Sequence, residues 1–194
     1  MRCWACSQRI SLRDLSRSRD RRDSRRTTMG RTAAKRDPKA LIHEVFTREA
    51  AHMSLDEAVA DFPAGEINTK APHLSYSFWH ILEHIRIGQR DLLEYVQNPK
   101  LVSPEWPEGY WPPADATTDP AGWKRTIAAI KADLERMDRL LADPGIDIFA
   151  PVPFANNQSV VRCAFLALRH NSYHLGEFAI LRQVMDLWPK NRKG

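Results

Sequence analysis

The chain has 194 residues, of which 43% are hydrophobic, and a formal net charge of +5. This length and composition suit one globular domain with a buried core. No apolar run approaches the roughly 20 residues of a membrane-spanning helix, and the first residues lack the apolar segment of a secretory signal. Three cysteines do not make a disulfide framework, so we expect a cytoplasmic protein.

The positive charge is concentrated in residues 1–37, which hold 12 Lys/Arg and 4 Asp/Glu. The rest of the chain has 17 basic and 20 acidic residues, so we expect no nucleic-acid binding by the folded domain. The Arg/Ser-rich segment lacks large aliphatic residues, which predicts a disordered tail. It is a basic arm, a targeting peptide or an extension ahead of the natural start. We favour the last interpretation, with translation from Met29.

Helical periodicity begins at Pro38, which marks the start of a folded domain over residues 38–194. Pro38 follows Asp37, an arrangement typical of the first helical position after an N-cap. The apolar residues that follow recur at helical spacing: Leu41, Ile42, Val45 and Phe46. Ser54 and Glu57 form a capping-box pattern that predicts a second, short helix ending before Pro63.

A long helix is expected from Ser75 to about Gln97, because Asn98-Pro99 stops it. Residues 99–117 then hold five prolines, which predicts a long structured loop. The loop also carries three large aromatic residues: Trp106, Tyr110 and Trp111. These rings either wall a binding pocket or pin the loop to the bundle, and both interpretations stay open.

The clearest helical seam lies between Asp119-Pro120 and Asp143-Pro144. Its apolar residues follow one another at steps of 4, 3, 4, 3 and 4: Trp123, Ile127, Ile130, Leu134, Met137 and Leu141. After a second loop, Ser159 opens a final helix that runs to about Trp188. No segment shows the two-residue alternation of strands. The sequence therefore predicts an all-α bundle of four long helices and one short helix.

Two histidine pairs with i, i+4 spacing are the most informative feature of the chain. His170 and His174 lie in the final helix, and His80 and His84 lie in the helix over residues 75–97. Residues four apart share a helix face with Cβ atoms about 5–6 Å apart, so two imidazoles can converge on one metal ion. Neutral imidazole suits Zn, Ni, Fe or Cu. Spacing alone does not distinguish a mononuclear metal site from hydrogen-bonded core histidines.

Three other residues are candidates because they lie close to the histidine pairs. Glu83 is adjacent to one pair and Glu177 follows the other, so each carboxylate either assists a metal site or faces solvent. Cys163 shares the inward stripe of His170 but comes seven residues earlier, a helix rise of roughly 10 Å. We interpret it as a small core thiol that lines the interior, not as a ligand.

Three segments resemble motifs of the DinB-like superfamily of four-helix-bundle metalloenzymes. Residues 78–87 (FWHILEHIRI) resemble its second-helix motif, and residues 170–177 (HNSYHLGE) resemble its last-helix motif. Residues 103–112 (SPEWPEGYWP) are similar to the loop of one bacterial subgroup. The resemblance covers about residues 39–187 and implies an up-down-down-up bundle with a long Pro/aromatic loop.

The resemblance also implies a set of metal ligands. Carried over residue by residue, the three histidine ligands of the family fall on His84, His170 and His174, and His80 lies outside the triad. The implied cofactor is a divalent metal ion: Zn, Ni, Fe or Mn. Water would complete the coordination sphere, and three protein ligands with an open position are typical of a catalytic site.

The function implied by the resemblance is metal-dependent chemistry on a small molecule. Some related proteins are transferases or isomerases that use low-molecular-weight thiols such as bacillithiol or mycothiol, and these bundles often form homodimers. A metal ion that deprotonates a thiol produces a strong nucleophile near neutral pH. The same centre could activate water for hydrolysis. The alternative is a non-catalytic, stress- or damage-related bundle whose metal is structural.

Overall fold

The computed structural model describes residues 37–47 and 52–190. The basic segment 1–36, including Met29, lies outside these residues. The described part contains five α-helices: α1 (Pro38–Thr47), α2 (Leu55–Val59), α3 (Phe78–Tyr95), α4 (Pro120–Ala142) and α5 (Val160–Val184). This confirms the all-α class. Within the described ranges, no helix combines the length and hydropathy needed to cross a bilayer.

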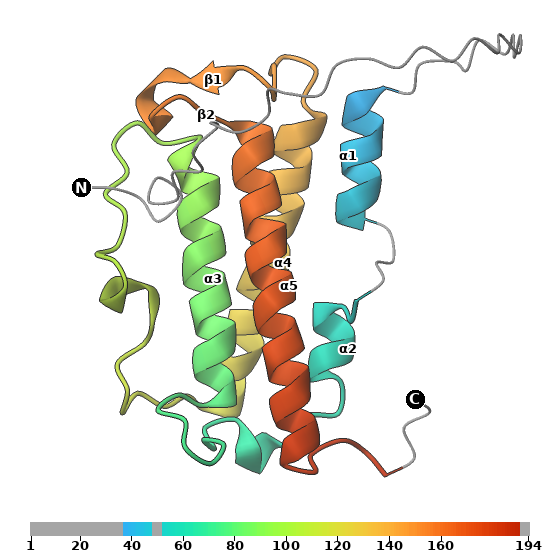
Figure 1. Cartoon of the computed structure of the whole chain (residues 1–194), viewed down its shortest axis with the longest axis vertical. Helices are drawn as coiled ribbons and strands as arrows, with labels where there is room; N and C mark the ends of the chain where they lie inside the picture. Colours follow the sequence, from blue (N-terminus) through green and yellow to red (C-terminus); the bar gives the residue numbers. More distant parts are fainter. Residues whose placement is uncertain (1–36, 48–51, 191–194) are drawn as a thin grey trace, which may run out of the picture.

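The long helices α3, α4 and α5 stand side by side, and the shorter α1 and α2 follow one another along the remaining column (Figure 1). Among the described residues, α3, α4 and α5 have 18, 23 and 25 residues, α1 has 10 and α2 has 5, consistent with the expected helical bundle with an additional short helix. α1 and α5 run in one direction and α3 and α4 in the other (Figure 1). Because α3 and α4 are parallel, residues 96–119 must return along the length of the bundle, which explains the long loop.

Side-chain caps decide where the helices begin. The capping box at α2 is present, with the Ser54 hydroxyl accepting from the Glu57 amide at 3.2 Å and Glu57 Oε2 accepting from the Ser54 amide at 2.7 Å. Ser77 caps α3, so this helix starts three residues later than the expected Ser75. Asp119 caps α4, and Ser159 caps α5 as predicted.

The expectation that the chain has no strands is wrong at one place. Strands β1 (Pro151–Val152) and β2 (Gln158–Ser159) form a two-stranded antiparallel ribbon just before α5. Between them lies the 3₁₀ turn η4 (Pro153–Ala155), and two further 3₁₀ turns are η2 (Ala64–Glu66) and η3 (Glu108–Tyr110). Asn156 and Asn157 take the left-handed conformation, with φ of 49° and 58°, and reverse the chain. The strands are too short to show alternation in the sequence.

The core is divided into two hydrophobic clusters with a polar layer between them. One cluster gathers Leu92, Leu93, Met137 and Leu141 with Ala167 and others. The second gathers Phe78, Ile81, Ile85 and Ile130 with Phe178 and others. On α3 and α5, the residues between these clusters are polar or small: His84, Gly88, Gln89, His170, Asn171 and His174.

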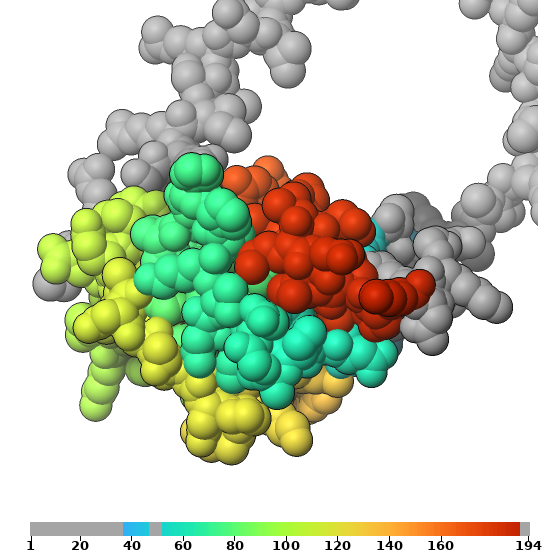
Figure 2. All heavy atoms as spheres, turned by 90° about the horizontal axis from the view of Figure 1, so that it is seen from below, coloured from blue at the N-terminus to red at the C-terminus, as the bar shows by residue number. Residues whose placement is uncertain are grey.

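The segment around α2 closes one end of the bundle against the C-terminal end of α5 (Figure 2). Arg182 on α5 is fully buried and donates to the Ala58 carbonyl at 2.8 Å. Its guanidinium lies 3.9 Å from the ring centroid of Trp188 and 5.1 Å from that of Phe62. These contacts tie α2 to α5. The other chemically distinctive part of the interior is the polar layer.

Candidate metal centre

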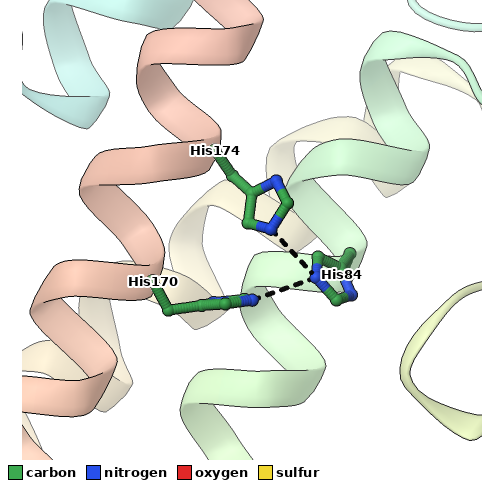
Figure 3. A group of neighbouring side chains, drawn as sticks. All are labelled: His84, His170 and His174. Atoms are coloured by element: carbon green, nitrogen blue, oxygen red, sulfur yellow. Dashed lines mark hydrogen bonds between the residues drawn. The ribbon is translucent and has the colours of Figure 1, made fainter. Parts of the chain in front are cut away.

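Three histidine side chains from two helices meet in the polar layer (Figure 3). His84 comes from α3, and His170 and His174 come from consecutive turns of α5. The Nε2 atom of His84 lies 3.0 Å from that of His170 and 3.2 Å from that of His174. His84 is 4% and His174 9% exposed. Among the described residues, this is the one group of His, Cys, Asp or Glu that is close enough to hold a metal ion.

Hydrogen bonds at Nδ1 orient two of the three rings. His84 Nδ1 lies 2.8 Å from the carbonyl oxygen of Tyr110, and His174 Nδ1 lies 2.8 Å from Oε2 of Glu177. A carbonyl or a carboxylate can only accept, so each Nδ1 carries the proton. In the neutral rings both Nε2 atoms then hold lone pairs, and these lone pairs face each other at 3.2 Å. Such an arrangement calls for a cation between them.

The spacing of the nitrogens fits one metal ion. Nitrogens that bind Zn²⁺ at about 2.0–2.1 Å lie roughly 3.3–3.4 Å apart in tetrahedral geometry, and about 2.9 Å apart at right angles. The separations of His84 Nε2 from the Nε2 atoms of His170 and His174, 3.0 and 3.2 Å, lie between these values. The hydrogen bonds of His84 and His174 to a carbonyl and a carboxylate are also the partners that metal-bound imidazoles usually have.

Burial favours the unprotonated form of two of the imidazole rings. Desolvation, followed by the neighbouring His174, lowers the pKa of His170 to about 3. Desolvation also lowers the pKa of His84 to about 4, against a smaller opposing effect of the hydrogen bond to Tyr110. Both rings are therefore neutral at pH 7, which is the form that binds metal.

An aromatic and carboxylate shell surrounds the triad. Trp111 stacks on His84 with ring centroids 3.9 Å apart and an interplanar angle of 6°. Tyr76 packs against Trp111 at 5.2 Å and donates its hydroxyl proton to Glu177. The pKa of Tyr76 is raised to about 12, chiefly by burial and then by this hydrogen bond. Glu177 thus links Tyr76 to His174, and its own pKa is lowered mainly by the hydrogen bond from His174.

The structure separates His80 and Glu83 from the triad. His80 is 2% exposed, but its ring nitrogens contact the Ser77 hydroxyl at 2.7 Å and the Pro113 carbonyl at 2.9 Å. It ties the long loop to α3. Glu83 pairs with Arg86 at 2.6 Å and accepts from Thr126 at 3.0 Å. Glu83 therefore faces α4, because the residue next to His84 in the sequence points about 100° away around the helix.

The remaining candidates from the sequence are Tyr110, Trp106 and Cys163. Tyr110 is buried and donates to Asp91 at 2.7 Å, so its side chain pins the loop while its carbonyl orients His84. Trp106 is 47% exposed and packs on the Tyr110 ring, with centroids 5.5 Å apart. Cys163 is fully buried in the hydrophobic cluster of Leu92 and Met137, as expected of a core thiol.

Two residues of the site, Gly88 and Tyr76, were missed in the sequence. Gly88 lies one helical turn after His84. A Cβ atom at Gly88 would lie 3.2 Å from Cε1 of His170. The glycine therefore makes room on α3 for the imidazole from α5, at a cost of about 1 kcal/mol in helix propensity. A glycine in the middle of an otherwise regular helical pattern was the available signal. Tyr76, which lies in a connection before α3, gave no comparable signal.

A chain of hydrogen-bonded amide groups also belongs to the polar layer. Asn171, next to His170, donates to Gln89 Oε1 at 2.6 Å, and Gln89 donates to the Ile130 carbonyl at 2.8 Å. Both side chains are buried. These bonds connect α5, α3 and α4 at the level of the histidines, and they fix the rotation of α5 relative to α3.

The fold and the site together define a helical bundle with a three-histidine centre. A comparison with protein-family models agrees: the model of the DinB superfamily matches residues 48–178. The chain therefore belongs to the DinB superfamily. No curated protein and no solved structure matched the chain significantly.

Proposed function

We propose that this protein is an enzyme that uses a divalent metal ion, Zn, Ni, Fe or Mn, to activate a small-molecule thiol. The observation that carries the proposal is the convergence of three Nε2 atoms, from His84, His170 and His174. No fourth His, Cys, Asp or Glu joins them among the described residues. Three protein ligands leave a coordination position for another molecule, which is typical of catalytic sites and not of structural ones.

The chain supplies the binding and the orientation of this centre. His84 and His174 are held in the tautomer that presents Nε2, by the Tyr110 carbonyl and by Glu177. Glu177 fixes the ring orientation of His174 and would add a negative charge close to a bound cation. A bound divalent metal would supply the Lewis acidity that lowers the pKa of a thiol or a water molecule.

The substrate is a small molecule that fits beside aromatic rings. Trp111 and Tyr76 lie next to the triad. Tyr173 is 72% exposed, and the centroid of its ring lies 4.9 Å from that of the His174 ring. These rings offer apolar area for the body of a ligand whose reactive group reaches the centre. Membership of the DinB superfamily favours a low-molecular-weight thiol such as bacillithiol or mycothiol, with water activation as the alternative use.

A second candidate function is a structural metal that joins α3 to α5 in a non-catalytic protein. It is favoured by the position of the triad in the middle of the bundle, between two hydrophobic clusters. The two functions make the same prediction for metal content and differ in their response to thiols.

The test begins with elemental analysis of the full chain, purified without added metal. We expect close to one divalent metal ion per chain, lost in His170→Ala. His43→Ala is the control, since His43 is an exposed histidine of α1 whose Nδ1 lies 2.8 Å from Asp138. Metal content that survives in His84→Ala and His170→Ala would contradict the site.

The enzyme proposal needs a further measurement. In the Co²⁺-substituted protein, cysteine or bacillithiol should change the visible absorption spectrum through sulfur-to-metal charge transfer. An unchanged spectrum, together with a melting temperature that chelation lowers, would favour the structural metal.

A further inference from the structure

Both carboxylate oxygens of Glu177 are engaged by hydrogen-bond donors. Oε2 accepts from Nδ1 of His174 at 2.8 Å, and Oε1 accepts from the hydroxyl of Tyr76. A carboxylate can only accept, so both partners carry the hydrogen. Among the described residues, no lysine or arginine pairs with Glu177. Its negative charge is therefore not compensated by a cationic side chain of the described part of the chain.

Glu177 lies where a carboxylate could itself bind a metal ion. It follows His174 by three residues, and side chains three apart share one face of a helix. Di-iron helical bundles bring a glutamate and a histidine with this separation, in the opposite order, to one metal centre. Zn²⁺ also binds carboxylate oxygen as well as imidazole nitrogen. In the structure, however, Glu177 stays outside the group formed by the three histidines. The fold therefore has to keep this carboxylate away from a bound ion if the centre is to stay open.

The hydroxyl of Tyr76 is held in place by its ring and by the neighbouring backbone. The ring packs against Trp111 with centroids 5.2 Å apart, and Trp111 in turn stacks on the triad. The next residue, Ser77, caps α3 and pairs with Lys70 in an isolated β-bridge. Tyr76 is therefore a donor fixed by its own surroundings and does not depend on Glu177 for its position.

We propose that Tyr76 is a positioning residue whose hydroxyl holds Glu177 as the hydrogen-bond partner of His174 and prevents the carboxylate from binding the metal ion. The open coordination position is thereby kept for the substrate, so this role rests on the metal-dependent function proposed above. To become a ligand, Glu177 would have to give up the bond from Tyr76, which is charge-assisted and so among the stronger hydrogen bonds of a protein. It would also leave Nδ1 of His174 without its acceptor.

The ring of Tyr76 also supports Trp111 against the triad, which is a structural role. The two roles can be separated, because the hydroxyl and the ring make different contacts. Tyr76→Phe keeps the ring and its packing and removes only the donor. A structural role of the ring predicts little change at the metal ion in this variant. The positioning role predicts a carboxylate that competes with the substrate for the ion.

The first test measures whether the coordination position of the Co²⁺-substituted full chain is open. The protein is titrated with azide and with cysteine, and visible absorption follows the binding. Azide needs only a free coordination position, whereas cysteine brings the thiol of the proposed reaction. We expect Tyr76→Phe to retain one Co²⁺ per chain and to bind both ligands about tenfold or more weakly, the factor that corresponds to one charge-assisted hydrogen bond. Its spectrum without added ligand should also differ from that of the unmodified protein, because a carboxylate oxygen has joined the three nitrogens.

The matched control is Tyr95→Phe, at the last residue of α3. The Tyr95 hydroxyl accepts a hydrogen bond from Nδ2 of Asn156 at 2.7 Å, so this variant also loses a tyrosine hydroxyl and its bond, but not beside Glu177. We expect it to bind azide and cysteine as the unmodified protein does. Circular dichroism checks that all variants keep their helices.

The second test is rescue by a change at Glu177. In the double variant Tyr76→Phe/Glu177→Gln, the amide oxygen of glutamine can still accept from His174, but the side chain no longer brings a negative charge to the metal ion. We expect the affinities for azide and cysteine to return to those of the unmodified protein. A displaced ring or loop would not be repaired by this substitution, so rescue distinguishes the positioning role from a structural one.

An unchanged azide affinity in Tyr76→Phe, or a loss that persists in the double variant, would overturn the proposal. An unmodified Co²⁺ protein that does not bind azide would also overturn it, because the coordination position would then be closed. The cysteine titration separates this proposal from the proposed function. Cysteine that leaves the spectrum of the unmodified protein unchanged would count against thiol activation, while azide would still test the role of Tyr76.

Discussion

At the scale of single residues, the site depends on which atom each imidazole presents. His84 and His174 present Nε2 because Nδ1 donates to the Tyr110 carbonyl and to Glu177. Gly88 supplies the space into which His170 projects. Each of these contacts is a local chemical constraint whose removal has a defined consequence.

Gly88→Ala should weaken metal binding without lowering the stability of the metal-free protein. Alanine improves helix propensity by about 1 kcal/mol, but its Cβ would lie 3.2 Å from the His170 ring and displace Nε2 by a few tenths of an ångström. We expect a metal-free protein with an unchanged or higher melting temperature and weaker metal affinity. Competition with a chromophoric chelator measures the affinity.

Gly176→Ala is the control for metal affinity, since its Cβ meets nothing within 4 Å in the chain. Equal metal affinities of the Gly88→Ala and unmodified proteins would show that the ring adjusts without cost.

The pH dependence of the metal-free protein follows from the lowered histidine pKa values. The pKa of His84 is about 4 and that of His170 about 3 in the folded protein, against about 6.5 in the unfolded chain. As the pH falls below 6.5 the unfolded state takes up protons first, so the free energy of unfolding decreases. This contribution is fully present above pH 6.5.

Between pH 6.5 and 5, the melting temperature of the metal-free protein should therefore fall. The double variant His84→Gln/His170→Gln should show a smaller decrease over the same interval. An identical slope in the two proteins would mean that these rings do not resist protonation in the fold. Glu177 does not confuse the measurement, because its lowered pKa acts below this interval.

At the scale of elements, residues 96–119 do more than connect two parallel helices. Backbone carbonyls in this segment accept from His84 and His80, and the Tyr110 hydroxyl donates to the buried carboxylate of Asp91. The loop therefore helps to hold the ring of His84, a candidate metal ligand, in place. Tyr110 pins the loop, as one interpretation of the aromatic residues has it. The other, a binding pocket walled by these rings, stays a prediction, supported by the stacking of Trp111 on His84.

Tyr110→Phe should weaken the loop and the metal site together. The variant loses one charge-assisted hydrogen bond, which costs roughly 1.5–3 kcal/mol, and the Tyr110 carbonyl no longer has a fixed position beneath His84. We expect faster amide hydrogen exchange across residues 101–116 and a lower metal affinity.

The control for the loop is Val102→Ala, at a residue 75% exposed in the same segment. Loop exchange that increases in Tyr110→Phe without any change in metal affinity would show that the carbonyl does not orient His84.

At the scale of the whole molecule, the triad joins α3 to α5 midway between the two hydrophobic clusters. A ligand that binds only the folded state stabilises it by about 2.7 kcal/mol at a hundred times its dissociation constant. Excess Zn²⁺ should therefore raise the melting temperature, and a chelator should reverse the increase. The rise should be absent in His170→Ala and present in His43→Ala, a change at an exposed histidine of α1. A similar rise in His170→Ala would place the stabilising ion elsewhere.

The helices could be predicted in order and nearly in length from caps and periodicity. Asp119-Pro120, Ser159 and the seam from Trp123 to Leu141 mark α4 and α5 correctly, because these signals are local. The two-stranded ribbon could not be predicted, since two residues per strand show no period. The separate short helix after Ser54 was predicted from its capping box, which is also a local signal.

By itself, the sequence determined the helical class, the two pairs of histidines and the motifs shared with the DinB superfamily, since these depend on residues near one another along the chain. The spacing of the first pair did not distinguish its two histidines; the resemblance singled out His84, and only the tertiary structure decided the physical reason. His80 and His84 lie on the same helix and are both buried. They differ in the loop carbonyl that each ring contacts, that of Pro113 for His80 and that of Tyr110 for His84. That loop, and the rotation of α5 against α3, are set by contacts between residues far apart in the sequence.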